Sequence, residues 1–304
     1  METDANPTNK KIFVILNPVG GHSNPDSIRR ALDESCTSLG WSYEIYETTG
    51  KENVADITRA ACQRGIDMVI AAGGDGTVAE VVNGMVNSPI PLGIIPVGTG
   101  NGLARALSIP LNPADAIKLL ADGHQVMAID AMQVGDKFYV LDVSAGISSR
   151  AMRDTSTEQK RRFGVVAYAW IILRQLLTFQ PRRYNLIIDG HQVQVSAAEI
   201  LVSNGVLLEK PPFPLGPREY FNDGQFNVYV LLARNLLDYL RLIGQFLINP
   251  KKRKAELRSL TVKQSISIDA VRRTQPVQAD GELIGRTPVE VCIVPNAIQV
   301  IVPQ

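Results

Sequence analysis

Three glycine-rich segments carry the residues whose types and spacing suggest chemistry. They read NPVGGHS from Asn17, GGDGT from Gly73 and GTGNG from Gly98, and each follows a short apolar run. Glycine lets a backbone approach a ligand closely, and the free N–H groups at a helix start attract phosphate. Asp75, the lone carboxylate of GGDGT, is a residue type that binds Mg²⁺ or its waters. The segments therefore suggest a phosphate site with a cation; the alternative is a tight turn in which Asp75 caps the next helix.

The patterns of several other sites are missing. There is no G-x-x-x-x-G-K-[ST] phosphate loop. A G-x-G-x-x-G loop is also lacking, because a pattern that starts with Gly98 and Gly100 has Leu103 in place of its third glycine. A dinucleotide site is therefore poorly supported, even if Glu44 or Glu47 is taken as the acid that binds the ribose. The absence of His-x-x-x-His, Cys-x-x-Cys and Gly-x-Ser-x-Gly argues against a zinc site and a serine hydrolase.

The elements that must position these segments alternate along the first half of the chain. Short apolar runs predict strands at 12–16, 43–46, 67–72 and 92–96. Helical spacing and Asn, Pro and Gly signals predict helices at 25–39, 53–64, 78–85, from 103 onward and 113–122. This order predicts an α/β domain with a parallel sheet and helices on both faces. The three glycine-rich segments then leave strands at the carboxyl edge, where such sheets bind ligands.

The pattern changes beyond residue 127. Strand-like runs occur at 184–188, 193–195, 200–202, 226–231, 259–268 and 289–302. Asp189-Gly190 is a hairpin signal, and two apolar helices are expected at 165–179 and 236–247. We expect an antiparallel sandwich or barrel-like second domain, joined to the first by a short hinge at 125–130.

Composition limits the class of protein. The 304 residues suggest about two domains, and 31 basic against 30 acidic residues give no global field for nucleic acid. Three widely spaced cysteines fit reduced thiols, and the polar first eleven residues carry no signal-peptide core. No apolar stretch of about 20 residues is available to span a membrane. A cytoplasmic protein without a nucleic-acid partner is expected.

In combination, the motifs resemble the diacylglycerol kinase catalytic-domain family, especially its bacterial lipid kinases, which share a superfamily with sphingosine kinases and NAD kinases. The matching pieces span nearly the whole chain and read NPVGG, AAGGDGTVAEVVNGM, LGIIPVGTGNGLAR, NDGQFNV and ADGE. The resemblance implies an α/β nucleotide-binding domain at 1–127 and a C-terminal β-sandwich acceptor domain at 128–290. It also implies that 291–304 returns to the first domain and that the active site lies in the interdomain cleft.

The resemblance also implies roles for individual residues. Glu282 would accept the proton, with Asp280 as its rival, and Asp75 would act with the metal. A structural Mg²⁺ would be held by Asp223, assisted by Tyr220 and Gln225. ATP contacts would come from Asn17, Pro18, Val19, Gly20, Gly21, Thr48, Gly73, Gly74, Asp75, Gly76, Thr77, Val78, Ala79 and Thr99. Without the resemblance, Asp223-Gly224 and Asp280-Gly281 are ordinary hairpin signals and Thr48 is an ordinary turn residue.

Two positions depart from the family pattern. Gly102 stands where the family usually has an aspartate, and the expected consequence is a change in acceptor preference or in the surroundings of the site. Asn227 replaces another usual aspartate, and local packing is the expected consequence. Arg105, after the third segment, is a candidate phosphate contact or a surface helix arginine.

Lipid access is the remaining expectation. The two apolar helices are candidates to touch a bilayer or an acyl chain, with core packing or packing against a second subunit as the alternative. Lys251–Lys254 reads KKRK and could attract anionic headgroups, or lie in a solvated loop. Peripheral membrane association and a homodimer are both expected possibilities.

The sequence therefore predicts an ATP- and Mg²⁺-dependent lipid kinase that phosphorylates a diacylglycerol-like hydroxyl. The alternatives are an NAD-kinase-like soluble phosphotransferase and a non-catalytic regulator that binds a nucleotide or lipid.

Overall fold

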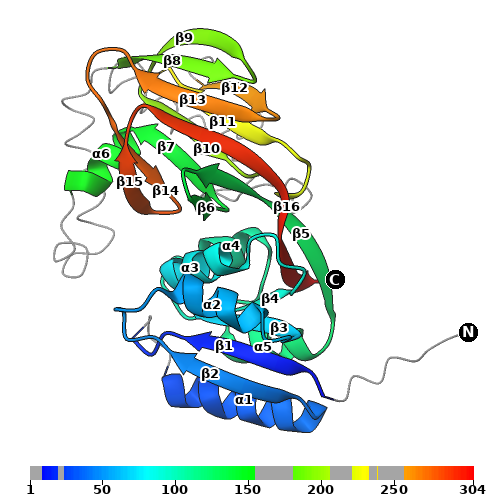
Figure 1. Cartoon of the computed structure of the whole chain (residues 1–304). Coiled ribbons are helices and arrows are strands. Elements are labelled where there is room, and N and C mark those ends of the chain that lie inside the picture. Colours follow the sequence, from blue (N-terminus) through cyan, green and yellow to red (C-terminus); the bar gives the residue numbers. More distant parts are fainter. Residues whose placement is uncertain (1–8, 20–23, 155–180, 206–220, 233–237, 239–256) are drawn as a thin grey trace, which may run out of the picture. The chain divides into compact units, whose positions relative to one another are not determined.

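The computed structural model describes residues 9–19, 24–154, 181–205, 221–232, 238 and 257–304 (Figure 1). The chain forms two compact units. The first comprises Met1–Asp130 and Pro295–Gln304, and the second comprises Ala131–Val294. In sequence, the second unit therefore interrupts the first.

A parallel sheet forms the centre of the first unit. Its strands run in the order β2-β1-β3-β4, and the end of the long strand β16 lies parallel to β4. Their bounds are Lys11–Leu16 (β1), Ser42–Glu47 (β2), Met68–Gly73 (β3), Leu92–Pro96 (β4) and Val289–Pro303 (β16). β1, β3 and β4 are buried along almost their whole length, as expected for strands with helices on both faces.

Helices cover both faces of this sheet, with α1 and the pair α2–α3 on opposite sides (Figure 1). They are Pro25–Leu39 (α1), Val54–Cys62 (α2), Asp75–Met85 (α3), Gly102–Ala106 (α4) and Pro113–Ala121 (α5). The side chains of Asn24, Asn53 and Asn112 each accept an N–H of the first turn, and so start α1, α2 and α5. α2 packs so closely on α3 that a Cβ at Gly84 would lie 2.5 Å from the Ala55 carbonyl oxygen. That approach accounts for the glycine of the VVNGM sequence.

The second unit is a sandwich of two layers. One sheet has the antiparallel order β12-β11-β10-β7-β14-β15, and the other layer has the order β16-β13-β8-β9 and a β5–β6 hairpin that pairs with β16. The remaining bounds are His124–Val134 (β5), Lys137–Tyr139 (β6), Asp142–Gly146 (β7), Ile147–Asp154 (α6), Arg182–Ile188 (β8), His191–Ala197 (β9), Glu199–Ser203 (β10), Phe226–Leu231 (β11), Leu257–Val262 (β12), Ser265–Ala270 (β13), Pro276–Ala279 (β14) and Glu282–Arg286 (β15). Side chains from both layers share one core, for example Leu186 and Ile268 with Ile200 and Val228.

The predicted fold class is confirmed: a parallel-sheet α/β unit and an antiparallel C-terminal sandwich. One strand prediction was wrong, because 259–268 is two strands, β12 and β13, with a turn at Lys263 and Gln264. The Asp189 carboxylate, from the β8–β9 hairpin, accepts the N–H groups of Lys263, Gln264 and Ser265 and stabilises that turn. The predicted hinge at 125–130 lies within β5.

Some predictions fall on parts that the structure does not describe. The expected helix at 165–179 and Lys251–Lys254 lie outside the described residues, as does the expected helix at 236–247 apart from Asp238. Among the described residues, no helix combines the length and apolar character needed to cross a membrane.

Candidate active site

The glycine-rich segments of the first unit meet at one edge of the sheet. Asn17 follows β1 and donates its N–H to the Ala72 carbonyl at 2.9 Å, and Val97 follows β4 and donates to the Gly73 carbonyl at 3.1 Å. Thr48, which is buried, follows β2 and donates its N–H to the Leu16 carbonyl at 2.9 Å. The chain segments that leave the four neighbouring strands thus start side by side, as the sequence predicted for a parallel sheet.

Glycines allow the second and third segments to touch. A Cβ at Gly98 would lie 2.6 Å from the Gly74 Cα, closer than real Cβ contacts. A Cβ at Gly73 would lie 2.4 Å from the Thr77 Cβ. The Asn17 amide donates to the Thr77 hydroxyl at 3.2 Å and adds the first segment to this cluster. These glycines therefore serve close packing between backbones as well as any ligand.

Asp75 joins the second segment to the third. Its carboxylate accepts the N–H groups of Asn101 at 2.9 Å and Gly102 at 2.5 Å. A Cβ at Gly100 would lie 2.5 Å from the Asp75 Oδ2, so the glycine makes room for the carboxylate. Asp75 does not cap its own helix, because Gly74 is the N-cap of α3 and has no side chain to do so. The capping alternative is therefore wrong in detail: Asp75 binds the start of α4, not of α3.

The structure adds Asn101 to the candidate residues. Its backbone is left-handed, with φ at 52°, and its side chain accepts from the Gly98 N–H at 3.0 Å and donates to the Gly98 carbonyl at 2.7 Å. Arg105 donates from Nε to the Gly100 carbonyl at 2.8 Å. Both side chains shape the third segment. The one sequence signal for Asn101 was an asparagine between glycines, a residue that tolerates positive φ.

The predicted nucleotide residues differ in exposure. In α3, Thr77 and Val78 are buried while Gly76 is exposed, so a ligand would meet the backbone of this turn before the Val78 side chain. The first N–H groups of a helix have no carbonyl partner within it, which favours an anion at this turn. The other predicted residues are half-buried (Asn17, Pro18, Gly74, Asp75 and Ala79), buried (Thr48 and Gly73), exposed (Val19 and Thr99) or outside the described residues (Gly20 and Gly21).

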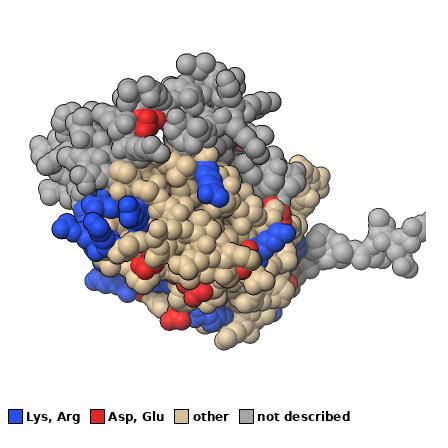
Figure 2. All heavy atoms as spheres, turned by 90° about the horizontal axis from the view of Figure 1, so that it is seen from above, with Lys and Arg blue, Asp and Glu red and all other residues tan. Residues whose placement is uncertain are grey.

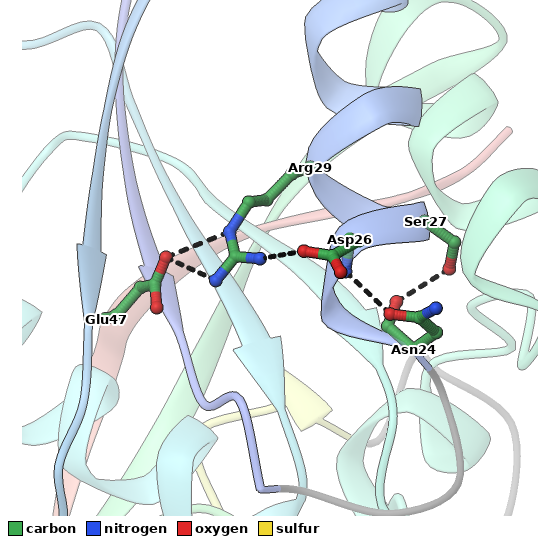
Figure 3. Close-up of polar contacts among 5 residues, drawn as sticks. All are labelled: Asn24, Asp26, Ser27, Arg29 and Glu47. Atoms are coloured by element: carbon green, nitrogen blue, oxygen red, sulfur yellow. Dashed lines mark hydrogen bonds and ion pairs between the residues drawn. The ribbon is translucent and has the colours of Figure 1, made fainter.

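Polar contacts hold the start of α1, the helix that follows the first segment in sequence (Figure 3). The Asn24 side chain accepts the Asp26 N–H at 2.9 Å, and the Arg29 guanidinium lies between Asp26 and Glu47. Arg29 Nε donates to Glu47 Oε1 at 2.9 Å, which ties α1 to the end of β2. The Glu47 carboxylate is thus paired with Arg29, and this pairing argues against Glu47 as the acid that would bind a ribose.

In the second unit, the ADGE turn is held by its own side chains. The Asp280 carboxylate accepts the N–H groups of Val140, Leu141 and Asp142 at 2.8, 2.9 and 3.0 Å. Glu282 is the exposed first residue of β15, two positions further on. Asp280 therefore has a structural role that uses both of its oxygens, and this favours Glu282 over Asp280 as the group that meets a substrate.

A half-buried acid, Asp142, contacts this turn. Burial, and then the charge of Asp280, raise the pKa of Asp142 to about 7, although a hydrogen bond from Gln278 opposes the rise. Burial also raises the pKa of Glu199, whose carboxylate accepts from Ser148. No motif in the sequence marked these two acids.

The predicted metal residues form a local turn. The Asp223 carboxylate accepts the Gln225 N–H at 3.1 Å and its side-chain amide at 3.0 Å, and Tyr220 lies outside the described residues. Among the described residues, no group of three or more His, Cys, Asp or Glu is placed to hold a metal ion. The Asn227 amide donates to the Gly205 carbonyl at 3.4 Å, a bond that an ionised aspartate could not make.

Comparisons with known proteins place this arrangement in a family. A family model described as the diacylglycerol kinase catalytic domain matches residues 11–134. A second family model, described as the YegS C-terminal NAD kinase beta sandwich-like domain, matches residues 142–302, which is more than half of the chain by itself. The chain belongs to the diacylglycerol kinase catalytic-domain family. The predicted family, and with it the prediction of a kinase, are confirmed.

Relatives match this diacylglycerol kinase family member over almost their whole length. The diacylglycerol kinase of Bacillus subtilis (strain 168) is 28% identical over 97% of this chain and 97% of its own. That of Staphylococcus carnosus (strain TM300) is 26% identical over 97% of this chain and 96% of its own. A crystal structure of a diacylglycerol kinase from Bacillus anthracis has the same fold, with a TM-score of 0.75, 21% identity and 96% of each chain covered.

The glycine that departs from the diacylglycerol kinase family pattern has a place in the cluster. Gly102, at the position where the family usually has an aspartate, begins α4 and donates its N–H to Asp75. It contributes a backbone group, where an aspartate would add a second carboxylate close to the first.

Proposed function

We propose that the protein is an ATP- and Mg²⁺-dependent lipid kinase that transfers the γ-phosphate to the hydroxyl of a diacylglycerol-like acceptor. The observation that carries the proposal is the cluster at the sheet edge, where the second and third glycine-rich segments are joined through Asp75 and the first through Asn17. Phosphoryl transfer depends mainly on positioned phosphates and on charge stabilisation, so glycine-rich segments held together at a sheet edge suit it.

In this proposal, the nucleotide lies against the glycine-rich segments. The start of α3 offers N–H groups to phosphate, and Asn17 and Thr77 keep the first segment beside it. Thr48 and Thr99 belong to the same set of segments. The exposed Gly76 gives the phosphates access to the backbone of the turn.

The residues present fit a magnesium ion. Mg²⁺ prefers oxygen ligands and keeps several waters. Each Asp75 oxygen accepts one N–H, and a carboxylate oxygen has room for a second partner, so Asp75 can still bind Mg²⁺ or its waters. When bound, the ion would neutralise phosphate charge during transfer. Asp223 and Gln225, with Tyr220, would hold a second, structural Mg²⁺ in the other unit.

Glu282 would take the proton of the acceptor hydroxyl. A hydroxyl is a weak nucleophile until a base shares its proton, and such help is typically worth about 10²–10⁴-fold. Glu282 is exposed, while both oxygens of Asp280 are engaged by backbone N–H groups, which supports Glu282 as the base.

A lipid acceptor implies contact with a membrane surface, and we propose peripheral association on the cytoplasmic side. The second unit presents exposed Arg272 and Arg273, and the Val271 N–H donates to the Arg183 carbonyl at 3.0 Å, which places exposed Arg183 beside them. Figure 2 shows one face of the molecule, on which Lys and Arg side chains gather at the left edge. Each such charge near an anionic surface is worth about 1 kcal/mol.

Incubation with γ-labelled ATP, Mg²⁺, a panel of hydroxylated lipids and NAD tests the proposal. Label in a lipid supports it, label in NAD supports the NAD-kinase-like alternative, and no label in any acceptor supports a non-catalytic regulator. Glu282→Gln should lower turnover at least about 10²-fold with little change in ATP affinity. Glu290→Gln, at an exposed glutamate of β16 in the same unit, is the matched control and should keep its turnover.

A further inference from the structure

Gln278 lies at the centre of the contacts that hold the ADGE turn. It is the third residue of β14, is 6% exposed, and lies opposite Ser144 of β7. Its Nε2 donates to the Asp142 carboxylate and, at 2.8 Å, to the Ser144 hydroxyl. Its Oε1 accepts the Gly281 N–H at 3.0 Å. The side-chain amide thus uses both of its donor hydrogens and its acceptor oxygen, so its nitrogen and oxygen cannot be exchanged.

The same turn is held on its other side by Asp280. That carboxylate accepts three backbone N–H groups from residues 140–142, and the Asp280 N–H donates to the Asp142 carbonyl at 3.0 Å. Asp280 and Gly281 have positive φ, 45° and 86°, so the chain reverses sharply between β14 and β15. Glu282 is the next residue, and its backbone direction is set by this reversal.

We propose that Gln278 is a positioning residue for the reaction: with Asp142 it fixes the turn that presents Glu282 to the acceptor hydroxyl. This inference rests on the function proposed above. Its physical basis is that a reacting group displaced by about 1 Å can lose about 10²-fold in rate without any loss in binding. Gln278 does not touch the substrate; it acts through Gly281 and the turn.

The bonds of Gln278 extend into a buried polar chain. The Ser144 hydroxyl lies 2.9 Å from the Ser148 hydroxyl, and Ser148 donates to Glu199. Two of the three groups that contact the Gln278 amide, the Asp142 carboxylate and the Ser144 hydroxyl, accept a hydrogen bond from it. A carboxylate at position 278 would lack the donors that they require, while a glutamine satisfies them.

Reversal of donor and acceptor gives a sharp test. The side chain introduced by Gln278→Glu keeps an oxygen for the Gly281 N–H but meets the Asp142 carboxylate with no hydrogen to donate. In the double variant Asp142→Asn/Gln278→Glu, the new amide at position 142 can donate to the new carboxylate at position 278. The contact is then restored in the opposite direction. Asp142→Asn alone keeps an oxygen that accepts from Gln278.

The predicted results follow this logic. At about pH 8, turnover of Gln278→Glu falls by about 10–100-fold with the KM for ATP unchanged, and the double variant returns to within about threefold of wild type. Turnover of Gln278→Glu also rises towards about pH 6, because the introduced carboxyl group and Asp142 then share a proton that forms a hydrogen bond between them. Asp142→Asn, which keeps an acceptor for Gln278, loses less turnover than Gln278→Glu.

Stability and hydrogen exchange separate positioning from folding. Val277→Ala removes part of a buried core residue next to Gln278 and should lower the melting temperature without lowering turnover. The Gly281 N–H should exchange faster in Gln278→Glu and regain protection in the double variant. This readout needs no activity, so it tests the turn even if wild type phosphorylates no lipid or Glu282→Gln stays active.

Two results would overturn the inference. One is a Gln278→Glu enzyme with normal turnover and normal protection at Gly281 while Glu282→Gln is inactive; in that case the base assignment stands and the positioning role does not. The other result has two parts. Gln278→Glu loses turnover that the double variant does not recover, and Val277→Ala loses as much turnover as Gln278→Glu when the two variants have the same melting temperature. Loss of folding alone would then explain the effect.

Discussion

Asp75→Asn tests the central contact of the nucleotide loops. The wild-type carboxylate accepts two backbone N–H groups, one from Asn101 and one from Gly102. An asparagine keeps one oxygen, and its amide nitrogen then faces the other N–H donor. The substitution therefore breaks one charge-assisted bond, leaves a donor without an acceptor, and weakens the link between the second and third segments.

The size of the effect follows from that lost bond. Hydrogen bonds to charged groups contribute about 1.5–3 kcal/mol to the free energy of unfolding. For a unit of this size, the loss corresponds to a fall in melting temperature of roughly 3–12 °C. Because the link between the two segments would also be weaker and the cation would lose a negative ligand, turnover should fall by about 10²-fold or more.

Calorimetry and steady-state kinetics at saturating ATP and Mg²⁺ measure the two effects separately. The matched control is Asp189→Asn, because Asp189 also accepts backbone N–H groups but lies in the β8–β9 turn of the second unit. The control should lose stability and keep turnover. Asp75→Asn with an unchanged melting temperature would refute the anchoring contact, and turnover within about threefold of wild type would refute its role in the reaction.

Three further predictions concern other described residues. Gly100→Ala should raise the KM for ATP and lower turnover, because the added Cβ lies 2.5 Å from the Asp75 Oδ2 and displaces the carboxylate; an ATP titration measures this. Asp142 has its pKa raised in the folded state to about 7, so wild-type stability should fall as pH rises from about 4, where the unfolded carboxyl ionises, to about 7. The urea midpoint of Asp142→Asn should change less across this pH range than the midpoint of wild type. Replacement of Arg272 and Arg273 by Glu should weaken sedimentation with anionic vesicles at low salt, with the difference vanishing near roughly 0.5 M salt; unchanged binding would exclude this patch.

Local signals were enough to predict the first unit. An asparagine before a proline or a polar first turn marks the starts of α1, α2 and α5, and the apolar runs mark β1, β3 and β4. The glycine-rich segments followed from the same pattern, because parallel strands bring their carboxyl ends to one edge. The candidate site in this unit was therefore accessible from the sequence as a set of loops.

The contacts inside the site were not accessible in that way. Asp75 and Asp189 bind backbone N–H groups that lie 26 to 76 positions away, and Asp280 binds groups about 140 positions away. A backbone N–H is present at every residue except proline, so no residue type in the sequence marks the partner. The division of 259–268 into two strands has the same cause, since the carboxylate that stabilises the turn comes from another hairpin.

The route of the chain through the first unit affects how the protein is made. Val300 of β16 pairs with Leu92 of β4, and the Asn87 N–H binds the Ala297 carbonyl, so this sheet gains its last strand from residues synthesised after the whole second unit. At about 5–20 residues per second, a ribosome needs roughly 10–30 s to add residues 131–294. During that time β4 is an unpaired edge on the nascent chain, open to wrong partners. The sheet that carries the glycine-rich loops is thus completed late in translation.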